Sequence, residues 1–156
     1  MSDELLTTSK KRLQIADHFL TQTYPLLKDP KLLLSALDGI TKAHAELLAA
    51  ALQDASARGL AGKQALSGSP YLVFNGPVGE QYGITKLDLH MAEEMRELLA
   101  QHKTSMLEFP RKGALVMANE QYKLATISPE KVKTYLSRTK RLHGTIHDRI
   151  STPRRD

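Results

Sequence analysis

The chain has 156 residues, of which 41% are hydrophobic and 5% aromatic, with no Trp and no Cys. The lack of cysteine excludes disulfides, thiolate metal sites and cysteine nucleophiles, and no apolar run is long enough to predict a membrane segment. The net charge of the chain is +5. Residues 131–156 contain eight basic and two acidic residues and carry a charge of +6, so residues 1–130 carry −1. The absence of cysteine and of a membrane segment predicts a cytoplasmic protein. The basic C-terminal part predicts an acidic partner, and nucleic acid is the first candidate.

Two long helices are predicted in the first third of the chain. Leu and Ala must fill most of the core, and both residues favour helices over strands. Apolar residues recur at helical spacing over 9–24 and over 30–58. Asp29 is a good N-cap for the second helix, because Pro30 then occupies the first helical position. The short link between the two predicts an antiparallel helical hairpin.

Residues 59–83 differ from the segments around them. They contain six of the nine glycines, so we expect an irregular segment. Within it, "YLVF" (71–74) fits either a strand or a helical turn capped by Ser69. The glycines of "GPVGEQYG" are not followed by the Lys-Ser/Thr of a phosphate loop, so no nucleotide site is predicted there.

Capping residues mark the starts of two further helices. Thr85 begins the third, with Asp88 placed to complete a capping box, and the helix should reach about Lys103. Ser128 precedes a proline and begins the last helix, whose apolar stripe continues to residue 150.

A β-hairpin is predicted between these two helices, from residues 114–118 and 123–127 around "NEQY". The predicted fold class is therefore mainly α. It is a four-helix up-down bundle with a small β-hairpin before the last helix. Residues 1–150 would form one helical domain, and 151–156 a basic C-terminal tail.

One titratable residue falls on the apolar face of each predicted helix. Helical rotation places them in line with Leu, Ile or Met neighbours, and they are Asp17, His44, His102 and His143. Buried polar groups need partners, so these four either meet as a buried polar cluster or are satisfied separately. The chain has no HExxH or Glu-x-x-His motif, and no metal or other cofactor is predicted.

The last helix contains the basic stretch "RTKRLHGTIHDR" (138–149). Its cations, together with the next arginines of the tail, are typical of a phosphate-binding surface, and the residues we expect to contact phosphate are Arg138, Lys140, Arg141 and Arg149. The alternative is an ordinary solvated helix face.

The same stretch contains two arginine–histidine pairs. Four residues separate Arg138 from His143, and five separate Arg141 from His147. Both spacings resemble the Arg-x(4–6)-His pattern of the HEPN (higher eukaryotes and prokaryotes nucleotide-binding) superfamily. The resemblance implies a small helical bundle, in which an RNase would use Arg138 and His143 as catalytic residues without a metal. In HEPN nucleases an Asn, Asp or His commonly follows the arginine, whereas Thr139 and Leu142 occupy those places here.

Longer segments extend this resemblance. Residues 15–37, "YGI" (82–84) and "HKTSMLEFPRKGALVM" (102–117) resemble a group of small archaeal helical proteins with a HEPN-like build. The helical hairpin of residues 9–58 is similar to HEPN-type proteins as well. This resemblance implies a fold, and it leaves the activity open.

A second basic group lies after the third helix. Arg111 and Lys112 stand beside Phe109, and basic side chains next to an aromatic ring can bind phosphate and stack a base. The alternative is that Phe109 covers the end of the bundle while the charges are solvated.

Three functions follow from these patterns. The first is a HEPN-like domain that binds RNA or another phosphate-rich partner without catalysis, through the basic last helix. The second is a metal-independent RNase using Arg138 and His143. The third is a protein-interaction module, antitoxin-like or an assembly subunit, and a homodimer is compatible with each of them.

Overall fold

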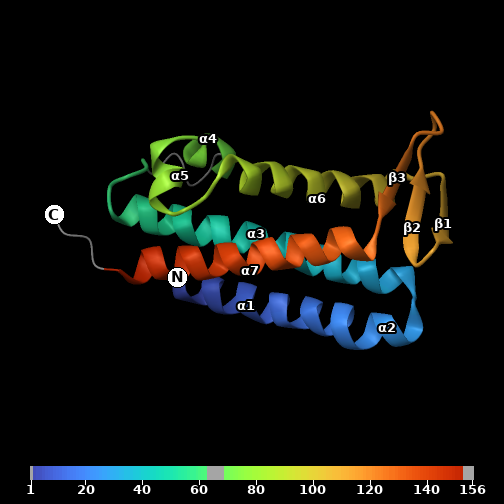
Figure 1. Cartoon of the computed structure of the whole chain (residues 1–156). Helices are drawn as coiled ribbons and strands as arrows, with labels where there is room; N and C mark the ends of the chain where they lie inside the picture. The colour runs from blue at the N-terminus through green and yellow to red at the C-terminus, as the bar shows by residue number, and fades with distance from the viewer. Residues whose placement is uncertain (1, 63–68, 153–156) are drawn as a thin grey trace.

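The computed structural model describes residues 2–62 and 69–152, and in this part of the chain four long helices lie along one another (Figure 1). Successive long helices run in opposite directions, and a small sheet covers one end of the bundle. α1 and α7 both pack against α3, while α6 contacts α3 and α7. The mainly helical prediction is confirmed. The long helices are α1 (Ser2–His18), α3 (Pro30–Ala57), α6 (Lys86–Thr104) and α7 (Pro129–Ser151).

The predicted capping residues start three of these helices. The carboxylate of Asp29 accepts a hydrogen bond from the backbone N–H of Lys31 at 3.0 Å, at the start of α3. Thr85 and Asp88 form the complete, reciprocal capping box of α6. Ser128 accepts from the backbone N–H of Lys131, the third residue of α7, at 3.1 Å. Each cap satisfies a backbone N–H that has no partner within its own helix, which is why local sequence predicts these starts.

The first helix is longer than predicted. It begins at Ser2 and continues from α1 through a π-helical stretch, η1 (Phe19–Thr23), into α2 (Tyr24–Leu27). Pro25 has no N–H to donate, which predicts a helix end, but the chain passes it with a widened turn in which the Tyr24 N–H bonds to the carbonyl of Phe19.

The predicted hairpin is part of a three-stranded antiparallel sheet with the order β1-β2-β3. β2 (Ala114–Ala118) and β3 (Leu124–Ile127) match the prediction, and β1 (Leu107–Arg111) was not predicted. β1 contains Pro110 and is largely exposed, as an edge strand can be, so its sequence shows no apolar alternation. The β1–β2 turn is Lys112-Gly113, both with positive φ, the geometry of a tight hairpin turn.

The glycine-rich segment is more ordered than predicted where the structure describes it. It contains two short helices, α4 (Pro70–Phe74) and α5 (Pro77–Gln81), so "YLVF" is a helical turn. Ser69 precedes α4 without a side-chain cap bond, and residues 63–68 lie outside the described part of the chain.

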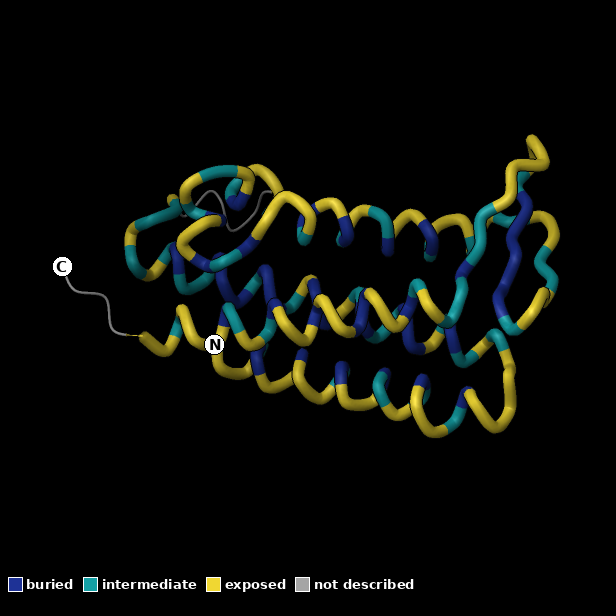
Figure 2. Tube along the Cα trace, viewed as in Figure 1, coloured by how far each residue is buried: buried dark blue, intermediate teal, exposed yellow. Residues whose placement is uncertain are grey.

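The core runs along the inward faces of the long helices (Figure 2). At the sheet end it joins α1, α3, α6 and α7 to β2 and β3, and at the opposite end it joins α1, α3 and α7 to α4 and α5. In the described residues, no helix is both long and apolar enough to cross a membrane.

Candidate functional site

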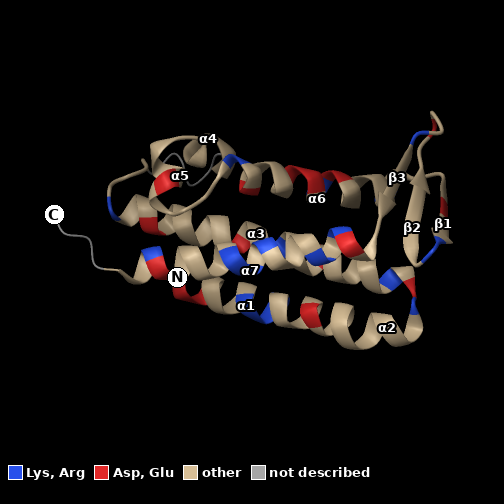
Figure 3. Cartoon of the chain, in the orientation of Figure 1, with Lys and Arg blue, Asp and Glu red and all other residues tan. Residues whose placement is uncertain are grey.

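Arg138 and Arg141 of α7 line one open cleft of about 410 Å³, between α7 and the start of α6. Figure 3 shows basic residues spaced along α7. We name this feature the arginine cleft. Its remaining walls come from the loop before α6, the first turn of α6 and the following turn of α7, and they are Gly83, Thr85, Leu87, Asp88, Leu142 and Thr145.

Helical periodicity places the two arginines on one side of α7, because residues three or four apart share a helix face. Thr145, four residues after Arg141, continues this face. Gly83 allows the loop before α6 to approach it: its φ is +70°, and a Cβ there would lie 2.3 Å from Cγ2 of Thr145. A larger residue at position 83 would push the loop away from α7.

The two guanidinium groups have no partner in the part of the chain that the structure describes. In residues 2–62 and 69–152, neither Arg138 nor Arg141 forms a side-chain hydrogen bond or an ion pair. Asp88 lies in the same cleft, but one carboxylate oxygen already accepts from the backbone N–H and the hydroxyl of Thr85, both at 2.9 Å. The arginine donors are therefore free to bind an oxyanion.

Lys140 and Arg149, predicted to contact phosphate, are exposed, and each has a partner within the chain. The Nζ of Lys140 lies 3.1 Å from a carboxylate oxygen of Asp17 on α1. Arg149 donates from Nη1 to the backbone carbonyl of Gln81 at 2.9 Å, which ties the end of α7 to α5. Neither residue lines the arginine cleft.

Arg111 and Lys112 lie elsewhere. Arg111 ends β1 and Lys112 occupies the β1–β2 turn, at the sheet end of the bundle (Figure 1). The neighbouring Gly113 carbonyl accepts a hydrogen bond from the hydroxyl of Tyr24, which fixes this turn against the first helix. The structure therefore divides the six predicted phosphate contacts among separate places, and two of them, Arg138 and Arg141, share the arginine cleft.

Arg138 and His143, the predicted catalytic pair, line different cavities on two flanks of α7. His143 lies on the α1 side, in a cavity with Lys10 and His147. Its Nε2 donates to the backbone carbonyl of Leu6 at 3.0 Å, and its ring stacks on that of His147 with centroids 6.2 Å apart. Five residues on a helix correspond to a rotation of about 140° between the two side chains. The pair does not converge within one chain.

The predicted buried polar cluster does not form. Only His44 is buried, at 1% exposure, while Asp17, His102 and His143 are partly exposed and have separate partners. Nδ1 of His102 lies 2.9 Å from a carboxylate oxygen of Glu108 on β1. Sequence places a residue on a helix face but does not show where the neighbouring helix ends or which strand supplies a partner. In the described residues no group of three or more His, Asp or Glu side chains is placed to hold a metal.

The chain is thus a mainly helical protein with a small antiparallel sheet and a cleft beside its last helix that is lined by two arginines. Comparisons of the chain with protein-family models, with curated proteins and with solved structures found no match. The HEPN-like build and the resemblance to archaeal proteins therefore stay predictions. Sequence reasoning missed Gly83 and Thr145 as parts of the cleft, and only the four-residue spacing from Arg141 to Thr145 could have indicated one of them.

Proposed function

We propose that this protein binds RNA or another phosphate-rich partner without cleaving it, and that the arginine cleft holds a backbone phosphate. The observation that carries the proposal is the pair of unpartnered guanidinium groups in one cleft. A guanidinium is planar and presents its N–H groups as a fork, which matches two oxygens of a phosphate. Arg138 and Arg141 can thus contact one phosphate or two successive ones.

The charge distribution supports the same proposal. Residues 131–156 hold eight basic and two acidic residues, against a body that is slightly acidic. Such a surface attracts a polyanion over a distance and orients it toward α7. Residues 153–156 of the basic tail lie outside the described part of the chain, so the charge of their arginines is known from the sequence alone.

Salt-dependent binding tests the proposal. We expect wild-type protein to bind single-stranded RNA with an affinity that falls as salt rises, because each phosphate contact releases counterions. Arg138→Ala and Arg141→Ala should each weaken binding, and each should reduce the slope of log affinity against log salt by about 0.7. The measurement is fluorescence anisotropy with labelled RNA at four salt concentrations.

Lys31→Ala is the matched control, since it removes one positive charge at the exposed start of α3, where no phosphate contact is predicted. It should leave the salt slope unchanged. If Lys31→Ala and Arg138→Ala reduce the slope equally, binding follows net charge and the cleft has no special role. If wild-type protein does not bind RNA at low salt, the protein-interaction alternative is favoured.

Cleavage assays separate binding from the RNase alternative. We expect wild-type protein to leave labelled RNA intact, because the cavity of His143 is on another flank of α7 from the arginine cleft. Substitution His143→Ala should leave RNA affinity within about twofold of wild type. Efficient wild-type cleavage that disappears in a folded His143→Ala variant would contradict the proposal and favour an RNase, with the second residue of the pair supplied across a dimer.

A further inference from the structure

A second cavity, unrelated to the arginine cleft, lies between α3, α6 and the start of α4. Its volume is about 90 Å³, enough for roughly three water molecules or a ligand smaller than benzene. We name it the His44 cavity. Most of its wall is apolar and is formed by Ala45, Leu48, Pro70, Leu89 and Ala92.

His44 lines this cavity and is unsatisfied. Its exposure is 1%, and neither ring nitrogen has a hydrogen-bond partner in the described part of the chain. Burial lowers the pKa of His44 to about 4, and the charge of Arg96 adds to this effect. The charge of Asp88 and its nearby backbone oppose the shift, but the backbone contact does not meet the geometry of a hydrogen bond to the ring. The ring is therefore neutral at pH 7, with one N–H to donate and one nitrogen to accept. Buried polar groups are almost always hydrogen-bonded, so this exception points to a missing partner.

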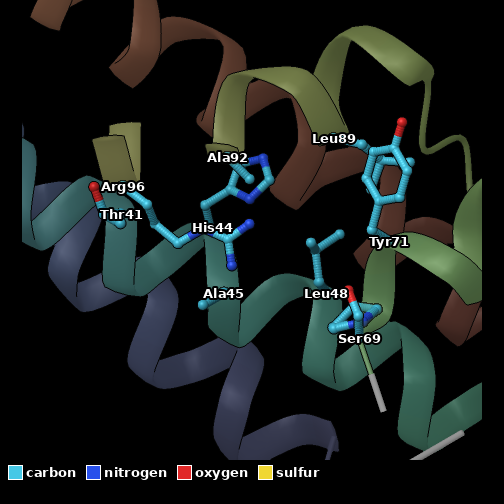
Figure 4. A pocket seen from close by; sticks show the side chains of 10 residues that line it. Thr41, His44, Ala45, Leu48, Ser69, Tyr71, Leu89, Ala92 and Arg96 are labelled. Atoms are coloured by element: carbon cyan, nitrogen blue, oxygen red, sulfur yellow. The ribbon is translucent and has the colours of Figure 1, made fainter. Parts of the chain in front are cut away.

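Arg96 of α6 supplies a positive charge at the same cavity. In the described residues its guanidinium has no ion pair and no hydrogen bond. Figure 4 shows the guanidinium and the His44 ring on one side of the cavity, with Tyr71 on the opposite side and Leu48 between them. One end of the cavity thus offers hydrogen-bond donors and a charge, and the rest offers apolar contacts.

We propose that the His44 cavity binds a small aliphatic carboxylate of about two to four carbons. The carboxylate accepts hydrogen bonds from the guanidinium of Arg96 and from the ring N–H of His44, and the short carbon chain packs against Leu48 and Leu89. This ligand satisfies the ring N–H of His44 and pairs the guanidinium of Arg96.

Size and charge favour a carboxylate over a phosphate. The cavity is small and mostly apolar, so a monoanion with a carbon tail loses less solvation on entering than a doubly charged phosphate. Asp88 is close enough to influence the titration of His44, and its negative charge opposes a dianion more strongly than a monoanion. The site is thus distinct in ligand class from the arginine cleft and does not depend on the proposed function.

Titration of the isotope-labelled full chain with acetate, propionate and butyrate tests the proposal. We expect saturable shifts of the His44 ring signals in ¹⁵N NMR spectra, with the six histidines distinguished by single substitutions. Arg96→Gln should weaken binding about tenfold or more, since it removes a charge-assisted hydrogen bond. Lys31→Gln, which removes one positive charge at the exposed start of α3, should leave affinity unchanged.

Ala92→Leu keeps both polar residues and fills the cavity with an apolar side chain, so it should abolish the shifts without disturbing the fold. Propionamide has the size of propionate without its charge and should bind at least tenfold more weakly. The proposal is overturned if no carboxylate gives a saturable shift of His44, in which case the cavity holds water only. It is equally overturned if propionamide binds as well as propionate, or if Arg96→Gln binds as tightly as wild type.

Discussion

Lowering the pH from 7 to 4 is expected to remove about 3 kcal/mol of folding free energy through His44 alone. The pKa of this histidine is lowered from 6.5 to about 4 by burial, and each pKa unit corresponds to about 1.4 kcal/mol. Between these two values the unfolded chain binds a proton that the folded chain excludes. Stability contributed by the neutral ring is therefore complete above pH 6.5 and is lost as the pH falls toward 4.

The measurement is urea unfolding at intervals from pH 7 to pH 4, for wild type and for His44→Leu, in buffers without small carboxylates. Aspartate and glutamate also titrate near the lower end of this range, so the informative quantity is the difference between the two proteins. The variant should be at least as stable as wild type at pH 7, because it replaces an unsatisfied buried group by an apolar one. His90→Gln is the control, since His90 is exposed. Parallel profiles for wild type and His44→Leu would contradict the burial argument.

Replacing Gly79 by alanine is expected to lower the free energy of unfolding by about 2–3 kcal/mol. A Cβ at position 79 would lie 2.0 Å from the backbone oxygen of Phe74 and 2.9 Å from its carbonyl carbon. Main-chain atoms cannot rotate out of the way as a flexible side chain can, so α4 and α5 must move apart. Phe74 is 2% exposed and contacts the ring of Tyr82 edge-on, so the displacement reaches the core.

Gly144→Ala is the matched comparison, because Gly144 lies inside α7 and a Cβ there meets no atom within 4 Å. This variant should be more stable than wild type, by up to about 1 kcal/mol, since alanine has less backbone freedom to lose. Chemical unfolding followed by circular dichroism gives both values. Equal effects of the two substitutions would show that the contact between Gly79 and Phe74 does not limit the packing of α4 on α5.

The differences between prediction and structure in the fold have one physical origin. Pro25 breaks helical hydrogen bonding in general, but the π-helical turn of η1 carries the chain past it. Pro110 argues against a strand in general, but an edge position leaves its missing N–H without consequence. In both cases the rule that proline disfavours regular structure describes an average environment. Here the neighbouring segments accommodate the missing N–H, so the helix and the strand both form.

The site shows the same division. The sequence places Arg138 and Arg141 on one face of the last helix, because three residues are nearly one helical turn. It does not show that the loop before α6 closes a cleft over that face through Gly83, nor that Asp17 of α1 pairs with Lys140. Those contacts join residues far apart in the chain.

By itself, then, the sequence determined the features that depend on neighbours within about one helical turn: the capped starts at Asp29, Thr85 and Ser128, and the spacing of the arginines. Only the tertiary structure decided which polar residues found partners. Four titratable groups share apolar helix faces, yet three of them reach partners at the edges of the bundle and His44 alone is buried without one. A helix face is set by local geometry, whereas burial and pairing are set by what the rest of the chain brings against it.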